Sequence, residues 1–158
     1  MPAAPAARDP AAMTLQLPTP HPPAGQYVPA VRVGDLVFLS GAGPVRPDGS
    51  LVTGKVGGAV DPGTARDAAR LTGLQLLANL AAEVGGLDRV VRVVKVLGMV
   101  NCAPGFTALP AVIDGCSDVL VEALGDAGRG ARSAVGMAEL PFDICVEVEA
   151  VVQVAPAD

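Results

Sequence analysis

Two stretches with helical periodicity are separated by stretches typical of β-strands, and this order restricts the fold more than any other feature of the sequence. The first begins at Asp61-Pro62, where an aspartate can cap a helix and a proline fits the first turn. Apolar residues then recur at helical spacing until Gly85-Gly86, which predicts the end of this helix. A second helix is predicted at about residues 109–124, with Pro110 tolerated near its start.

The remaining segments have the composition and alternation of strands. Residues 27–41 predict two strands joined by a tight turn at Gly34-Asp35. A valine-rich strand follows at 90–100, and two more follow the second helix, separated by Pro141. The order is close to β-β-α-β-β-α-β-β, which predicts an α+β fold: a six-stranded mixed sheet with both helices on one face. Because no segment remains to cover the other face, we expect a second copy of the chain to cover it.

The 158 residues fit one domain with one hydrophobic core. Prolines crowd the first 23 residues, and we expect a flexible N-terminal arm at 1–15 followed by a single domain at 16–156. Hydrophobic residues make up 51% of the chain, but only three Phe, one Tyr and no Trp are among them. The predicted core is therefore aliphatic.

Composition argues against several classes of function. A net charge of −5, a pI near 4.7 and few aromatic residues disfavour a nucleic-acid partner. No apolar run is long enough to span a membrane, and no signal peptide is expected. Three cysteines without a CxxC spacing suggest reduced thiols in the cytoplasm. The only histidine, His21, lies in the proline-rich arm, so we expect neither a histidine-dependent nucleophile nor a metal site.

Arg132 stands in the apolar segment "GARSAVGMAELP" (130–141) and needs a partner, because an unpaired buried charge is costly. The segment "CVEVEA" alternates, so Cys145, Glu147 and Glu149 are expected on one strand face and the apolar residues between them under the helices. Two interpretations are open. Arg132 and the two glutamates form ion pairs at an interface, or Arg132 binds a carboxylate ligand.

Three segments together resemble the RidA/YjgF/YER057c/UK114 family, in particular its longer bacterial branch that is often labelled endoribonuclease L-PSP-like. They are "YVPAVRVGDLVFLSGAGPV", "VVKVLGMVN" and "ARSAVGMAELPFDICVEVEA", and the resemblance covers about residues 15–154. It implies a chorismate-mutase-like homotrimer with clefts between subunits. It also implies hydrolysis of enamine or imine intermediates, such as 2-aminoacrylate, to 2-keto acids and ammonia without a cofactor.

The resemblance also implies roles for individual residues. Arg132 would bind the substrate carboxylate, and Glu147 would orient water or move a proton. The cleft would further be lined by Tyr27, Ser40, Gly41, Ser133 and Ala134. The chain departs from the best-known deaminase branch at two of its positions: Ala134 replaces a cysteine, and Pro110 replaces a frequent asparagine.

Two other functions fit the same residues. A trimer that only binds small carboxylate metabolites would use Arg132 in the same way. An endoribonuclease, as the family label suggests, is disfavoured by the acidic pI and by the lack of a usable histidine.

Overall fold

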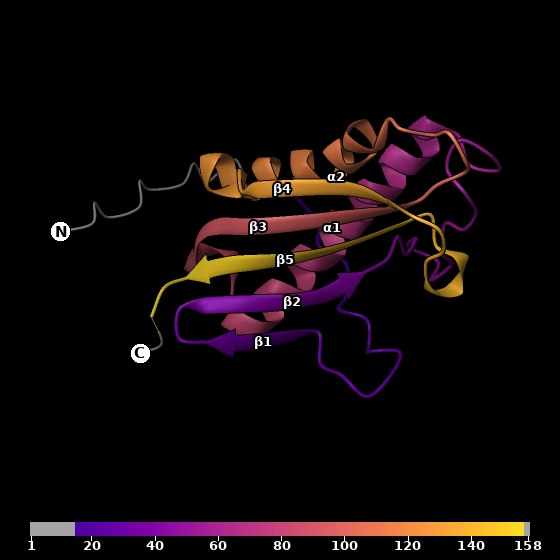
Figure 1. The fold of residues 1–158 in the computed structure, drawn as a ribbon. Coiled ribbons are helices and arrows are strands. Elements are labelled where there is room, and N and C mark those ends of the chain that lie inside the picture. The colour runs from indigo at the N-terminus through magenta and orange to yellow at the C-terminus, as the bar shows by residue number, and fades with distance from the viewer. Residues whose placement is uncertain (1–14, 157–158) are drawn as a thin grey trace.

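Two helices lie on one face of a mixed sheet in the computed structural model, which describes residues 15–156 (Figure 1). This arrangement confirms the predicted α+β class. The strands are β1 (Ala30–Val33), β2 (Leu36–Ala42), β3 (Val90–Asn101), β4 (Ala131–Met137) and β5 (Val146–Val154). The helices are α1 (Pro62–Val84) and α2 (Leu109–Leu124), and short 3-10 turns lie at Leu87–Arg89, Gly125–Gly128 and Pro141–Asp143.

The strand order across the sheet is β1-β2-β5-β3-β4. All neighbours pair antiparallel except β3 and β4, which are parallel and are connected through α2. A parallel pair needs such a crossover, because a short turn cannot return the chain to the starting end. In this strand order β4 is an edge strand, and the last strand of the chain, β5, lies in the middle of the sheet.

The ends of α1 are those that the sequence predicts. The carboxylate of Asp61 accepts a hydrogen bond from the Thr64 backbone N–H at 3.0 Å, as an N-cap does. Hydrogen bonds from Thr64 also lower the pKa of Asp61. Gly85 ends the helix in the left-handed conformation, with φ of 85°.

The sheet has five strands in the described residues, so the prediction of six is wrong. Residues between the two helices form one uninterrupted 12-residue strand, β3, rather than two. The segment from Val45 to Val60 makes only isolated bridges. Pro47 and the glycines with positive φ, such as Gly49 and Gly54, interrupt a regular ladder.

The core lies between the sheet and the helices and is aliphatic, as predicted. Cys116 is fully buried in it, and burial raises the pKa of its thiol to about 12. The opposite face of the sheet is left open in the single chain. Large apolar side chains on that face are substantially exposed, among them Val31, Phe38 and Val135.

The single domain at residues 16–156 stays a prediction. Leu15 and Leu17 pack against the core ahead of β1. The flexible arm predicted for residues 1–15 lies, except for Leu15, outside the described residues. No helix among residues 15–156 combines the length and the apolar character that a membrane crossing requires.

Candidate functional site

A cleft of about 820 Å³ opens where β2 ends and β5 begins. Four of the predicted site residues line it: Tyr27, Ser40, Gly41 and Glu147. Segments far apart in the sequence complete its walls. They include the proline-rich segment at 21–24, the loop after β2, the 3-10 turn at Pro141–Asp143 and polar residues of α1. The cleft therefore combines an apolar wall with a few polar groups, which is typical of small-molecule sites.

Glu147 provides the acidic group of this cleft. It is the second residue of β5, and its neighbours Val146 and Val148 are fully buried under the helices. Strand alternation therefore directs Glu147 to the open face. Partial burial, and secondly the charge of Glu149, raise the pKa of its carboxyl group. Its carboxylate has no hydrogen-bond partner among residues 15–156, so both oxygens can bind a ligand or water.

Gly41 gives Glu147 its space. The pairing of β2 with β5 shifts register between Leu39 and Ala42, which places Gly41 in an irregular part of the strand. A β-carbon at position 41 would overlap Oε1 of Glu147. A side chain at this position would therefore displace the flexible end of Glu147 from the place that it occupies beside the backbone.

Ser40 and Tyr27 hold the segment at 24–29 against the end of β2. The Ser40 hydroxyl donates to the carbonyl of Val28 at 2.7 Å, and its backbone N–H donates to the carbonyl of Pro29 at 2.9 Å. The Tyr27 hydroxyl accepts from the backbone N–H of Ala24 at 3.1 Å. Both hydroxyls thus fix the polypeptide that forms the cleft wall, while half of the Tyr27 side chain stays exposed.

Several lining residues were missed by the sequence analysis. Gln75 and Asn79 come from α1, where Gln75 Nε2 donates to Asn79 Oδ1 at 3.1 Å. One helical turn separates them, but nothing in the sequence relates this turn to β5. His21, from the proline-rich N-terminal segment, is exposed and also lines the cleft.

Phe142 stands at the same cleft with 70% of its surface exposed. It and Asp143 both have φ of 56°, an uncommon conformation for residues other than glycine. The buried side chain of Asn101 stabilises this turn, since its Nδ2 donates to Asp143 Oδ1 at 3.0 Å and to the Ile144 carbonyl at 3.2 Å. No local signal marks this contact, because its partners are more than 40 residues apart.

Cys145 does not share the face of Glu147, so that expectation is wrong. β5 begins only at Val146, and Cys145 lies before it, paired through its backbone with Val52 and Asn101. The side chain is fully buried in the core, and burial raises the pKa of the thiol to about 11. Ile144 lines the cleft instead.

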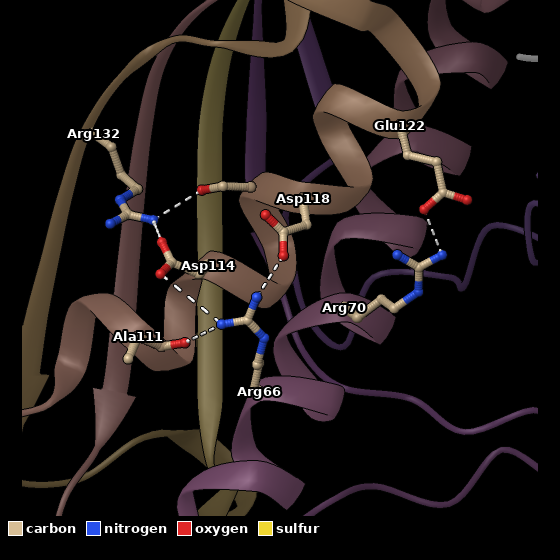
Figure 2. Close-up of polar contacts among 8 residues, drawn as sticks. Arg66, Arg70, Ala111, Asp114, Asp118, Glu122 and Arg132 are labelled. Carbon is tan, nitrogen blue, oxygen red and sulfur yellow. Dashed lines mark hydrogen bonds and ion pairs between the residues drawn. The ribbon is translucent and has the colours of Figure 1, made fainter.

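Arg132 lies on the other side of the sheet from Glu147. It is on edge strand β4, and its side chain extends toward α2 (Figure 2). Its Nη1 donates to Asp114 Oδ1 at 2.7 Å and to Ser117 Oγ at 3.0 Å. The guanidinium lines a separate shallow hollow of about 300 Å³. Within one chain, therefore, Arg132 pairs with Asp114 rather than with Glu147 or Glu149.

The two residues after Arg132 follow the alternation of the strand. Ser133 is on the open face, where its hydroxyl accepts a hydrogen bond from Lys95 Nζ at 2.8 Å. Ala134 returns to the helix side and packs against the core. The structure thus brings four predicted site residues together in the cleft and leaves Arg132, Ser133 and Ala134 at the β4 edge. Among the described residues, no group of three or more His, Cys, Asp or Glu side chains could hold a metal ion.

Comparison with known proteins gives consistent matches. A family model described as "YjgF/chorismate mutase-like, putative endoribonuclease" matches residues 8–151. Protein TCP17 of Trypanosoma cruzi is 40% identical over 140 residues, which are 88% of either chain. The crystal structure of Atu1372 from Agrobacterium tumefaciens, a protein of unknown function, is 39% identical with a TM-score of 0.81, covering 89% of this chain and 86% of that one. A putative endoribonuclease from Shewanella oneidensis MR-1 is 28% identical with a TM-score of 0.86, covering 91% and 95%.

Proposed function

Since this chain belongs to the YjgF/chorismate mutase-like family, we propose that it hydrolyses reactive 2-imino acids of the 2-aminoacrylate type to 2-keto acids and ammonia. It works as a homotrimer, with each site formed between two subunits, and it needs no cofactor. The observation that carries the proposal is Glu147: a half-buried carboxylate with a raised pKa, directed into an open cleft and free of any described hydrogen-bond donor. A carboxylate in such a setting is a suitable general base.

The positions of Arg132 and Glu147 support a site shared between subunits. Arg132 is on edge strand β4, whereas Glu147 is on the opposite face of the sheet. A neighbouring copy that covers the open face brings its own β4 edge within reach of this cleft. The exposed apolar residues of the open face, such as Phe38 and Val135, favour burial in such an assembly.

The chemistry needs little more than positioning. The enamine 2-aminoacrylate takes up a proton at its terminal carbon and becomes the iminium ion. Water then adds to the C=N carbon as Glu147 accepts one of its protons, which gives a carbinolamine. The proton passes from Glu147 to the nitrogen, the C–N bond breaks as the hydroxyl group releases its proton and becomes the carbonyl, and the keto acid and ammonia leave. Placement of water and substrate, together with the charge of Arg132, supplies a useful rate factor.

Arg132 binds the substrate carboxylate in this scheme. A planar guanidinium can donate two parallel hydrogen bonds to a carboxylate, which lysine cannot do. A small imino acid offers few other groups for recognition. The same contact would serve a protein that binds a carboxylate metabolite without reaction, so catalysis must be measured directly.

A ribonuclease is the second candidate, because the family description and more than one structural relative carry that term. The net charge of −5 opposes binding to phosphates. His21, the single histidine, is exposed and takes part in no described ion pair or hydrogen bond. The imine hydrolase therefore agrees better with the residues of the cleft.

The test couples the protein to a lyase or an amino-acid oxidase that releases an imine in situ. Formation of keto acid and ammonia is then followed with and without the protein. Acceleration that disappears in Arg132→Lys supports the hydrolase. Binding of a keto acid such as pyruvate without acceleration of hydrolysis would instead support a protein that binds carboxylate metabolites without catalysis. RNA cleavage that persists in Arg132→Lys after repeated purification would favour the ribonuclease.

A further inference from the structure

We propose that Asp114 is a positioning residue that holds Arg132 so that one edge of its guanidinium stays free for the substrate carboxylate. This inference rests on the proposed function of Arg132. Asp114 is on α2, 18 residues before Arg132, and it belongs to no part of the cleft that contains Glu147. Its role follows from the nitrogen of Arg132 that donates a hydrogen bond to it.

The hydrogen bonds of Arg132 involve a single nitrogen. Nη1 carries two N–H groups, and it donates to Asp114 Oδ1 at 2.7 Å and to Ser117 Oγ at 3.0 Å. Both acceptors lie on α2, one helical turn apart. The capacity of Nη1 is therefore used entirely by the protein.

The other two nitrogens of Arg132 have no acceptor among residues 15–156. Figure 2 shows Nε and Nη2 directed away from α2, on the side opposite to Asp114. One N–H of each points in the same direction, and this pair matches the two oxygens of a carboxylate. Three quarters of the side chain is buried. Asp114 thus leaves the edge formed by Nε and Nη2 free for a carboxylate and keeps Nη1 away from the ligand.

Asp114 is itself held in place by α1. Arg66 Nη1 lies 4.0 Å from Asp114 Oδ2 and donates to the carbonyl of Ala111 at 3.2 Å. Arg66 Nη2 donates to Asp118 Oδ2 at 2.6 Å. Charges of alternating sign therefore follow one another from Asp118 through Arg66 and Asp114 to Arg132 (Figure 2).

Gly115 makes this arrangement possible. A β-carbon at position 115 would overlap the carbonyl oxygen of Arg66, so the two helices can approach closely only because this residue is glycine. The close approach brings the Arg66 guanidinium next to Asp114. The position of Arg132 on an edge strand is thereby fixed by two helices behind the sheet.

A fixed arginine binds a carboxylate better than a mobile one. A free arginine side chain occupies many rotamers, and ordering them opposes binding. A guanidinium that is already ordered, with the correct edge exposed, loses less on binding. Removal of Asp114 should therefore weaken substrate binding, and the loss should exceed its effect on the chemical step.

The same contacts also join α1 to α2, so a purely structural role must be separated from a positioning role. Arg70 and Glu122 provide the matched control. Arg70 Nη2 lies 2.7 Å from Glu122 Oε2 and bridges the same two helices, but neither residue contacts Arg132 (Figure 2). A change at Glu122 should lower thermal stability as a change at Asp114 does, and it should leave substrate binding alone.

The experiment compares Asp114→Ala, Asp114→Asn, Glu122→Gln and Arg132→Lys with the wild type. KM and kcat are measured with 2-aminoacrylate released in situ, pyruvate affinity by calorimetry, and stability by thermal melting. For Asp114→Ala we expect KM and the pyruvate Kd to rise about tenfold or more, as the loss of a charge-assisted hydrogen bond implies, with a smaller change in kcat. Asp114→Asn should be intermediate, because its amide oxygen can still accept from Nη1. Glu122→Gln should keep wild-type KM.

Each outcome decides one question. If Asp114→Ala keeps wild-type KM and pyruvate affinity while Arg132→Lys loses activity, the positioning role is refuted and the proposed function stands. If both Asp114→Ala and Glu122→Gln raise KM in proportion to their loss of thermal stability, the role of Asp114 is structural. If Arg132→Lys itself retains full activity, the proposed function fails, and the inference fails with it.

Discussion

The backbone of Gly41 lies against the carboxylate of Glu147, so closely that a methyl group at position 41 would overlap Oε1. The Glu147 side chain of β5 therefore occupies the space that a side chain at position 41 of β2 would need, at the mouth of the cleft. The glycine leaves room for the acidic group beside the backbone. This relationship makes the identity of residue 41 a test of the role of Glu147.

Gly41→Ala should lower turnover, because the added methyl group forces the Glu147 side chain into another rotamer. Gly43→Ala is the matched control. Its β-carbon would meet only the end of the flexible Ile144 side chain, at 3.1 Å. Keto-acid formation and melting temperature should be measured for both variants. Full turnover in Gly41→Ala would show that the position of Glu147 in this structure is unimportant for the reaction.

Glu147→Gln should lower turnover by about a hundredfold or more, which is the usual effect of removing a general base. The amide keeps the shape of the side chain but cannot accept the proton from water. Glu149→Gln should retain most of the turnover, because Glu149 is two residues further along β5 and more exposed. Steady-state kinetics of both variants separate the roles. The reverse result would mean that the two glutamates have been assigned the wrong roles.

The pKa of Glu147 predicts the pH dependence of turnover. A general base must be ionised, so turnover should increase with pH on an acid limb that lies above the ordinary glutamate value of 4.5. Glu149 contributes to this shift through charge repulsion. In Glu149→Gln the acid limb should move to lower pH. Profiles that coincide for the two proteins would refute the coupling between these carboxylates.

The same shift affects stability. Folded Glu147 retains its proton at pH values where the unfolded chain has lost it, because its folded pKa is the higher of the two. The free energy of unfolding should therefore fall as pH rises from the ordinary glutamate value to the raised one. Denaturant unfolding of the wild type and of Glu147→Gln across this range should show a smaller decrease for the variant.

How much the sequence predicted depends on the distance over which each interaction acts. Local chemistry placed both ends of α1, since Asp61, Pro62 and Gly85 act within a turn of the helix. Strand alternation correctly directed Glu147 and Glu149 to the open face. The same rule failed at Cys145, because the strand begins one residue later and the preceding turn rotates the chain.

Contacts between remote segments could not be predicted. The partner of Arg132 is Asp114, which depends on the parallel crossover that brings α2 over β4. The approach of the proline-rich segment at 21–24 to β5 and the contact of Asn101 with the Phe142 turn arise in the same way. A periodicity shows which face a residue takes, but it does not show which other segment that face meets.

The open face of the sheet predicts assembly. Phe38 is 46% exposed in the single chain, and Val31 beside it in β1 is also exposed. Light scattering of the wild type should give three times the chain mass of 15.7 kDa. Phe38→Asp should reduce the measured mass, because burial of its charge in an interface is unfavourable. A monomer mass for the wild type at micromolar concentration would remove the basis for a shared site.

The separation of Arg132 and Glu147 on opposite sides of one sheet leads to a complementation test. In a trimer with sites between subunits, Arg132 of one copy acts with Glu147 of a neighbour. Arg132→Lys and Glu147→Gln should each be inactive alone. When the two variants are unfolded together and refolded as mixed trimers, some sites receive an intact arginine from one chain and an intact glutamate from the other. Random mixing in equal amounts should restore roughly a quarter of the wild-type activity.

Two controls make the complementation result decisive. Each variant refolded by itself should stay inactive, which shows that refolding alone restores nothing. Mixing the two variants after each has refolded separately should restore activity only as fast as subunits exchange. If the site instead forms within one chain, every mixed trimer contains only defective sites, and activity should stay at the level of the separate variants. A mixture without recovered activity, although mass measurements show mixed trimers, would therefore contradict a site between subunits.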